Sequence, residues 1–124
     1  MIKLKSIIGE VHENIMWTYK DAKPIADSIG GKVVGSVKTK GSSKHDLDIK
    51  VYKYTRDIAR TFYGMGYRDI GSQIVSPKEI RRSGKFGRND RFWLRSHGFM
   101  NYDNGKMIEV WSVEHDEIIN VNDI

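Results

Sequence analysis

Apolar residues recur every three or four positions in two segments of the chain, which is the spacing that places them on one side of an α-helix. Residues 6–19 form the first segment, and residues 55–66 form the second. Thr55 is the expected cap of the second helix, because a threonine hydroxyl accepts a hydrogen bond from the first turn. The buried face of this helix is expected to hold Ile58, Ala59, Phe62, Tyr63 and Met65.

A shorter helix is predicted over residues 23–29. Asp21 is its expected cap, and Pro24 would lie in the first turn, where a missing backbone N–H is tolerated. Gly30 and Gly31 are expected to end it, since glycine readily adopts the left-handed backbone that often follows a helix.

Short runs of β-branched or alternating apolar residues predict the strands. They cover residues 32–36, 46–52, 70–75, 91–100 and 106–113. Between the last two runs, the sequence Asn-Tyr-Asp-Asn-Gly predicts a tight hairpin turn, because Asn-Gly favours the backbone of such turns. The lysine- and glycine-rich residues 37–45 and the polar residues 76–90 are expected to be loops.

Five aromatic residues near the predicted hairpin are expected to pack in the core and across strands, in preference to stacking on a base. They are Phe92, Trp93, Phe99, Tyr102 and Trp111. The four histidines show no spacing typical of a metal site, so we expect them at the surface.

The composition indicates one globular domain over residues 1–124. With 39% hydrophobic and 30% charged residues, the chain contains enough apolar side chains for a core. The absence of cysteine excludes disulfides, thiolate metal ligands and cysteine nucleophiles. No apolar run has the length of a membrane span or a secretion signal, so we expect a cytoplasmic location and no membrane partner.

An excess of basic residues points to an anionic partner. The chain has 21 lysine and arginine residues against 16 aspartate and glutamate residues, which gives a net charge of +5. This balance is typical of proteins that bind phosphates or nucleic acid, although it also serves solubility. Four basic residues in the predicted loop at 76–90 would contact a nucleotide or a nucleic-acid backbone, or would simply be solvated. These residues are Arg81, Arg82, Lys85 and Arg88.

Two aspartates, Asp46 and Asp48, open the predicted strand at residues 46–52. Alternate side chains of a strand lie on one face, so the two carboxylates should lie side by side while Leu47 and Ile49 enter the core. Because like charges at that distance repel, the pair favours a bound cation, and carboxylate oxygens suit Mg²⁺ or Mn²⁺. The alternative is an exposed strand face without a ligand.

Gly35 and Ser36 end the preceding predicted strand. A glycine permits close approach of the backbone, and its turn can present amide and hydroxyl groups to a phosphate. An ordinary turn is the alternative. The lysines of the following loop would pair with phosphate groups, or would simply be solvated. They are Lys38, Lys40 and Lys44.

The combination of Gly35-Ser36, a loop with further glycine and serine, and the residues DLDI resembles the signature of the nucleotidyltransferase superfamily. This superfamily includes DNA polymerase β-like enzymes and minimal nucleotidyltransferases. The resemblance implies an α+β fold in which a mixed β-sheet of about four to five strands is flanked by helices. It also implies that Gly35 and Ser36 bind a nucleoside triphosphate.

Three carboxylates that hold two divalent ions are a further implication of the resemblance. Asp46 and Asp48 would supply two of them. Glu109, in the predicted strand at residues 106–113, is the best candidate for the third, while its rival Asp103 lies in the predicted turn.

The reaction implied by the resemblance is transfer of a nucleoside monophosphate from a nucleoside triphosphate to an acceptor hydroxyl, with release of pyrophosphate. Mg²⁺ or Mn²⁺ would be the cofactor, and the acceptor would be a nucleic-acid end or a protein. One alternative is a nucleotidyltransferase-like module that only binds, for example as the antitoxin-like partner of another protein. The other is a two-metal nuclease or phosphohydrolase.

Overall fold

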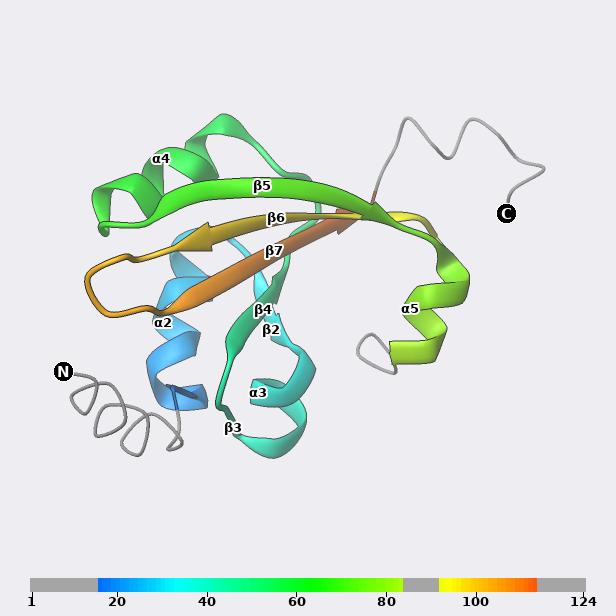
Figure 1. Ribbon diagram of the computed structural model, residues 1–124, viewed down its shortest axis with the longest axis horizontal. Coiled ribbons are helices and arrows are strands. Elements are labelled where there is room, and N and C mark those ends of the chain that lie inside the picture. Colours follow the sequence, from blue (N-terminus) through cyan, green and yellow to red (C-terminus); the bar gives the residue numbers. More distant parts are fainter. Residues whose placement is uncertain (1–15, 84–91, 114–124) are drawn as a thin grey trace, which may run out of the picture.

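A five-stranded mixed β-sheet forms the centre of the protein (Figure 1). The computed structural model describes residues 16–83 and 92–113. In spatial order, the strands are β2 (Lys32–Val34), β4 (Asp46–Lys50), β7 (Met107–Val113), β6 (Leu94–Met100) and β5 (Arg68–Val75). Strands β4 and β7 are parallel, whereas the other neighbours are antiparallel. The predicted α+β class and mixed sheet are therefore confirmed.

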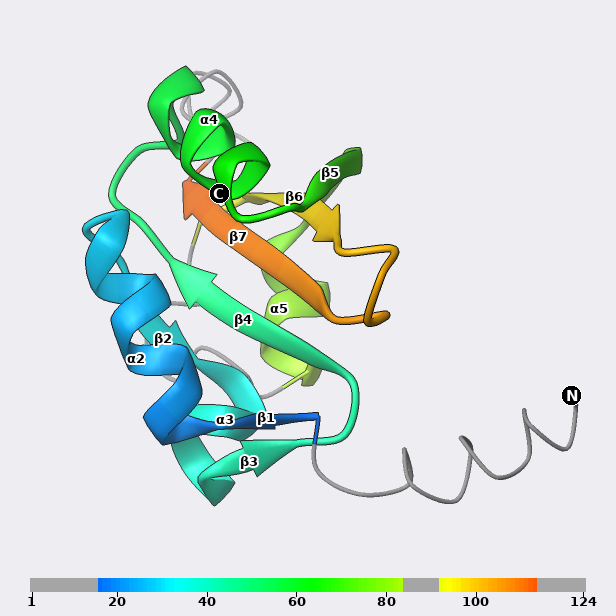
Figure 2. The same ribbon diagram turned by 90° about the vertical axis from the view of Figure 1, so that its left-hand side faces the viewer.

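Helices α2 (Tyr19–Ser28) and α4 (Arg56–Gly64) cover one face of this sheet (Figure 2). The α2 helix begins four residues earlier than predicted, because Thr18 and not Asp21 is its cap. The Thr18 hydroxyl accepts a 3.1 Å hydrogen bond from the Asp21 amide, and Pro24 consequently lies beyond the first turn. As predicted, the helix stops before Gly30, whose φ is +70°.

The α4 helix is capped by Thr55, as predicted. Ile58, Ala59 and Phe62 are buried on its inner face. The prediction was wrong for Tyr63 and Met65, which are 44% and 39% exposed, because the buried stripe of this short helix is narrower than the sequence pattern suggested.

The end of the predicted helix over residues 6–19 is instead a strand. Trp17 and Thr18 form β1 (Trp17–Thr18), which pairs with β3 (Ser42–Ser43). Trp17 is only 1% exposed, and its indole Nε1 donates a 3.1 Å hydrogen bond to the Met107 carbonyl. These long-range contacts override the local helical pattern, while residues 6–15 lie outside the described residues.

Two short helices occupy segments that the sequence predicted to be loops or, at Gly35 and Ser36, the end of a strand. Strand β2 ends at Val34, and α3 (Gly35–Lys40) follows it directly because the positive φ of Gly35, +73°, turns the chain out of the extended conformation. The α5 helix (Pro77–Ser83) covers part of the predicted loop at residues 76–90. Pro77 is its first residue, which is a favoured proline position that the sequence analysis missed.

The sheet has a core on each face. The larger core lies under α2 and α4 and contains Leu47 and Ile49 of β4, as predicted. The smaller core joins Ile80 of α5 to Leu94 and Trp111 on the opposite face. Because side chains alternate along a strand, Asp46 and Asp48 must share this opposite face with α5.

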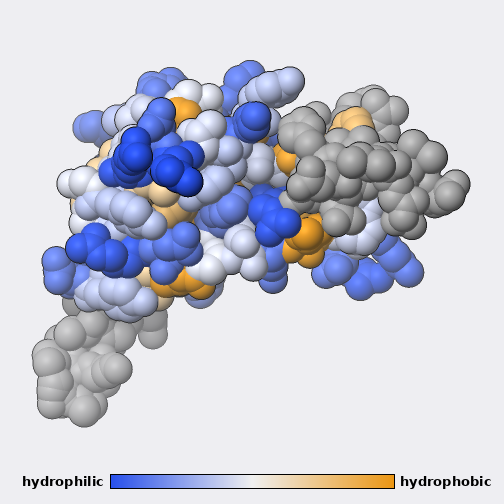
Figure 3. All heavy atoms as spheres, turned by 90° about the horizontal axis from the view of Figure 1, so that it is seen from above, coloured by the Kyte–Doolittle hydropathy of each residue, from blue (hydrophilic) through white to orange (hydrophobic). Residues whose placement is uncertain are grey.

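The outer edge of the sheet at β5 is open to solvent, because seven of the eight residues of this strand are exposed. Viewed over α4 and β5, apolar residues form separate small patches between polar ones (Figure 3). Across residues 16–83 and 92–113, the helices are too short or too polar to cross a membrane.

Candidate metal centre

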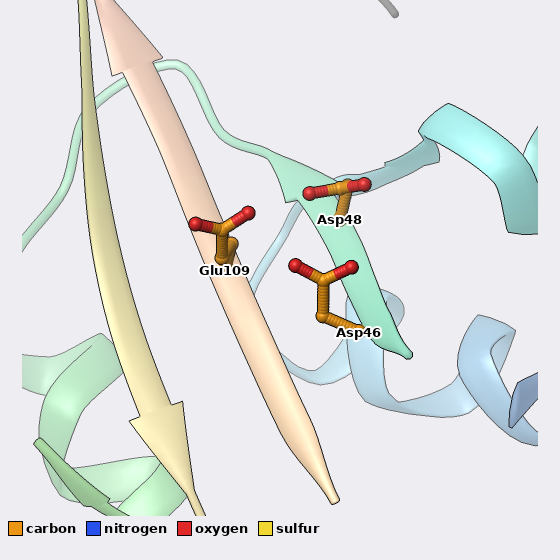
Figure 4. A group of neighbouring side chains, drawn as sticks. All are labelled: Asp46, Asp48 and Glu109. Carbon is orange, nitrogen blue, oxygen red and sulfur yellow. The ribbon is translucent and has the colours of Figure 1, made fainter. Parts of the chain in front are cut away.

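Three carboxylates from two neighbouring strands converge on the sheet face that carries α5 (Figure 4). Asp46 and Asp48 project from β4, and Glu109 projects from β7. Asp48 is the direct cross-strand partner of Glu109 in the parallel pair, and oxygen atoms from all three side chains lie within 4.8 Å of one another. The structure thus brings Glu109 to two aspartates that lie about sixty positions earlier in the sequence.

The charges of this group repel one another strongly. Asp48 is only 2% exposed, and Asp46 and Glu109 are partly buried, so water screens the carboxylates poorly. Two unit charges at this separation repel by about 3–4 kcal/mol at an effective dielectric constant of about 20. A divalent cation between the oxygens would turn this repulsion into attraction.

The donor set fits a hard divalent cation. All three side chains offer oxygen, and carboxylate oxygen is the preferred protein ligand of Mg²⁺ and Mn²⁺. Across the described residues, histidine contributes no ligand to this cluster. His45 is exposed, as predicted for a surface histidine, whereas the half-buried His97 ring stacks on Tyr54 at a centroid distance of 3.5 Å.

Hydrogen bonds from neighbouring strands orient two of the carboxylates. The indole Nε1 of Trp111 donates a 2.9 Å hydrogen bond to Oδ1 of Asp48, and the Ser96 hydroxyl donates a 3.2 Å hydrogen bond to Oε2 of Glu109. Sequence analysis missed both donors. Trp111 was predicted only to pack, although its place two residues after Glu109 puts it on the same strand face.

Gly35 lies directly against the metal centre. A Cβ atom at this position would stand 2.5 Å from Oδ2 of Asp48, so only glycine fits here without a shift of the carboxylate. Its φ of +73° gives a second reason for glycine, because side chains disfavour that conformation. The neighbouring Ser36 is exposed at the start of α3. The predicted phosphate-binding pair therefore adjoins the predicted metal ligands.

The three predicted triphosphate lysines occupy different places. Lys38 lines a cavity of about 550 Å³ that Gly35 also borders. Lys40 ends α3, and Lys44 follows β3, both with exposed side chains. Of the three lysines, Lys38 is thus the one that shares a cavity with Gly35.

The predicted basic loop falls largely outside the described residues. Arg81 and Arg82 belong to α5, which lies on the same sheet face as the carboxylates, and the Arg82 side chain is exposed. Lys85 and Arg88 lie outside the described residues. Their predicted contact with nucleotide or nucleic acid stays a prediction.

A second hollow begins on the other side of Glu109. It has a volume of about 240 Å³ and reaches across β6 and β5, where Gly98 and Gly71 line it. Ser96 and Gln73 supply polar groups to its wall. The carboxylates therefore stand between this hollow and Gly35.

Asp103, the rival third carboxylate, lies away from the cluster. It is exposed in the turn between β6 and β7, and its backbone N–H donates a 2.9 Å hydrogen bond to Oδ1 of Asn101. Of the two candidates, Glu109 is the residue that the fold brings to the two aspartates.

No family model, curated protein or solved structure matches this chain. The assignment of function therefore depends on the geometry of the metal centre and on its surroundings.

Proposed function

We propose that the protein is a metal-dependent nucleotidyltransferase, which transfers a nucleoside monophosphate from a nucleoside triphosphate to an acceptor hydroxyl. The observation that carries the proposal is the convergence of Asp46, Asp48 and Glu109 beside Gly35. Carboxylates that gather around hard cations next to a phosphate-accepting backbone are the parts that two-metal phosphoryl transfer needs.

In this reaction the acceptor oxygen attacks the α-phosphorus and forms the new P–O bond. The bond between the α-phosphorus and the bridging oxygen of the pyrophosphate breaks, and the hydroxyl proton passes to water. When bound, the cations lower the pKa of the hydroxyl and neutralise charge on the leaving oxygens. Asp46 and Asp48 would hold the ions, while Glu109 would orient the acceptor hydroxyl.

Two features beside the metal centre support separate places for donor and acceptor. Gly35 and Lys38 border a cavity on one side, where phosphate groups would meet a positive charge. The hollow lined by Ser96 and Gly98 begins at Glu109 on the other side and offers space for an acceptor. A nucleic-acid end is the proposed acceptor, because the chain carries a net charge of +5.

The proposal is tested by incubating the protein with Mg²⁺ or Mn²⁺, α-labelled nucleoside triphosphates and a panel of RNA, DNA and protein acceptors. We expect label on an acceptor, and loss of labelling when Asp46→Asn and Asp48→Asn are combined. Asp103→Asn is the matched control and should label as the wild type does. Equal labelling by the double variant contradicts the proposal, and labelled free monophosphate as the sole product would indicate a hydrolase instead.

A further inference from the structure

The cavity that Gly35 and Lys38 border lies at the free edge of β2, between α2 and α3. Its volume is about 550 Å³, within the usual range for a small-molecule site. Lysines dominate the ionic side chains of its wall. The charged residues are Lys23, Lys32, Lys38, Lys50 and Asp27.

Two of these lysines lie side by side on neighbouring strands. Lys32 of β2 and Lys50 of β4 are direct cross-strand partners, so their side chains lie on the same face. Like charges in this position destabilise a sheet. The fold thus keeps two cations close together beside a cavity.

The acidic residue of the cavity wall does not relieve this repulsion. Asp27 is held by Lys23, whose Nζ lies 2.8 Å from both of its carboxylate oxygens. Within residues 16–83 and 92–113, neither Lys32 nor Lys50 forms an ion pair. The positive charge of the pair is therefore available to a ligand.

We propose that this cavity binds a phosphorylated small molecule, with its phosphate group between Lys32 and Lys50. A phosphate dianion offers several acceptor oxygens to two ammonium groups and offsets both charges at once. The cavity is much larger than one phosphate, and Tyr19, Val33 and Val34 provide apolar surface for the rest of the ligand.

The cavity is the one that the proposed function assigns to the phosphates of the donor, and the inference rests on that function. Phosphate binding at Lys32 and Lys50 itself needs no metal ion, so its test is separate from the transfer assay. Gly35 borders both the cavity and Asp48, but the carboxylates do not belong to the cavity wall. Binding should therefore survive when Asp46→Asn and Asp48→Asn are combined.

The test is an NMR titration of the full chain in EDTA, with inorganic phosphate, AMP, ribose phosphate and adenosine as separate probes. We expect the phosphate-bearing probes to shift the amide signals of Gly31 and Val33, and adenosine to leave them unchanged. Lys50→Met and Lys32→Met should each weaken AMP binding at least about tenfold, because a charge-assisted contact is lost. Lys53→Met, at an exposed position just after β4, should bind as the wild type does.

A stability measurement separates loss of binding from loss of folding. Without ligand, Lys50→Met should unfold at the same or higher urea concentration than the wild type, because the substitution removes a like-charge contact and keeps an apolar stem. Equal AMP affinities of the wild type and Lys50→Met overturn the proposal. It is also overturned if adenosine binds as tightly as AMP, or if no phosphate-bearing probe shifts these signals at millimolar concentration.

Discussion

Trp111 donates the hydrogen bond from its indole Nε1 to Oδ1 of Asp48 at 2.9 Å, across 63 positions of the sequence. The same strand also carries Glu109, two residues earlier on the same face. Strand β7 therefore supplies one carboxylate of the cluster and holds another in place. This arrangement fixes the carboxylates of Asp48 and Glu109 relative to one another before any cation binds.

Trp111→Phe tests the strength of this contact. The substitution keeps most of the apolar packing but removes a donor from a buried carboxylate, so we expect the free energy of unfolding to fall by about 1.5–3 kcal/mol. Trp17→Phe is the matched control, because the Trp17 indole donates to a neutral carbonyl, that of Met107. For Trp17→Phe, the free energy of unfolding should fall by only about 0.5–1.5 kcal/mol. Urea unfolding in EDTA measures both values, and an equal or larger loss for Trp17→Phe would contradict a special role for the Asp48 contact.

Gly35→Ala should damage both the fold and the metal centre. Its Cβ would meet Oδ2 of Asp48, which adds about 1–3 kcal/mol of overpacking to the strain of the left-handed backbone. Gly41→Ala is the control with a similar φ, +82°, but with open space around the added carbon. Its free energy of unfolding should fall only by the cost of the backbone strain, about 1 kcal/mol. Similar unfolding energies for the two variants would argue against the contact between Gly35 and Asp48.

Asp46→Asn should stabilise the protein when no divalent cation is present. The change removes one of three close negative charges with little change of shape, so we expect a gain of about 1–3 kcal/mol in EDTA. With Mn²⁺ added, the wild type should become the more stable of the two proteins, because cation binding raises its free energy of unfolding by more than that of the variant. Asp103→Asn, an exposed change outside the cluster, should stay within about 0.5 kcal/mol of the wild type. A loss of stability for Asp46→Asn in EDTA would show that the carboxylates do not repel as inferred.

Tyr54 should make the protein sensitive to alkali. Burial, followed by the charges of Asp69 and Tyr63, raises the pKa of Tyr54 from 10.0 to about 12. The unfolded chain then loses this proton at a lower pH than the folded protein does. The stability that the neutral phenol contributes is therefore complete below pH 10 and disappears as the pH rises towards about 12.

Unfolding curves of the wild type and Tyr54→Phe across this pH range measure the effect. The variant should lose less stability than the wild type, whereas the exposed control Tyr102→Phe should follow the wild type. If the stabilities of the wild type and Tyr54→Phe depend on pH in the same way, the titration assigned to Tyr54 is contradicted.

The sequence was sufficient for features that depend on local periodicity. The alternation around Asp46 and Asp48 predicted a strand with carboxylates on one face, and the structure has that strand. Glu109 could be named as a candidate, but its approach to Asp48 depends on the parallel pairing of β4 and β7. Such pairing joins distant segments and leaves no local pattern. The donor Ser96 was missed for the same reason, since it reaches Glu109 from a different strand.

Tertiary contacts also explain the wrong element boundaries. The helical pattern before Tyr19 gave way to a strand at Trp17, because burial of this large side chain under the sheet outweighs a weak local preference. In α5, the buried side chain of Ile80 docks a short helix on the sheet, yet it gives no periodic signal in the sequence. The sequence therefore predicted elements better than it predicted their ends.

The central claim is that Asp46, Asp48 and Glu109 together bind a divalent cation, and titration of Mn²⁺ into the metal-free protein, followed by electron paramagnetic resonance, tests it most directly. We expect the wild type and Asp103→Asn to bind alike, and Asp48→Asn and Glu109→Gln each to bind at least about tenfold more weakly. Mn²⁺ affinity that is unchanged by Glu109→Gln and Asp48→Asn would contradict the claim.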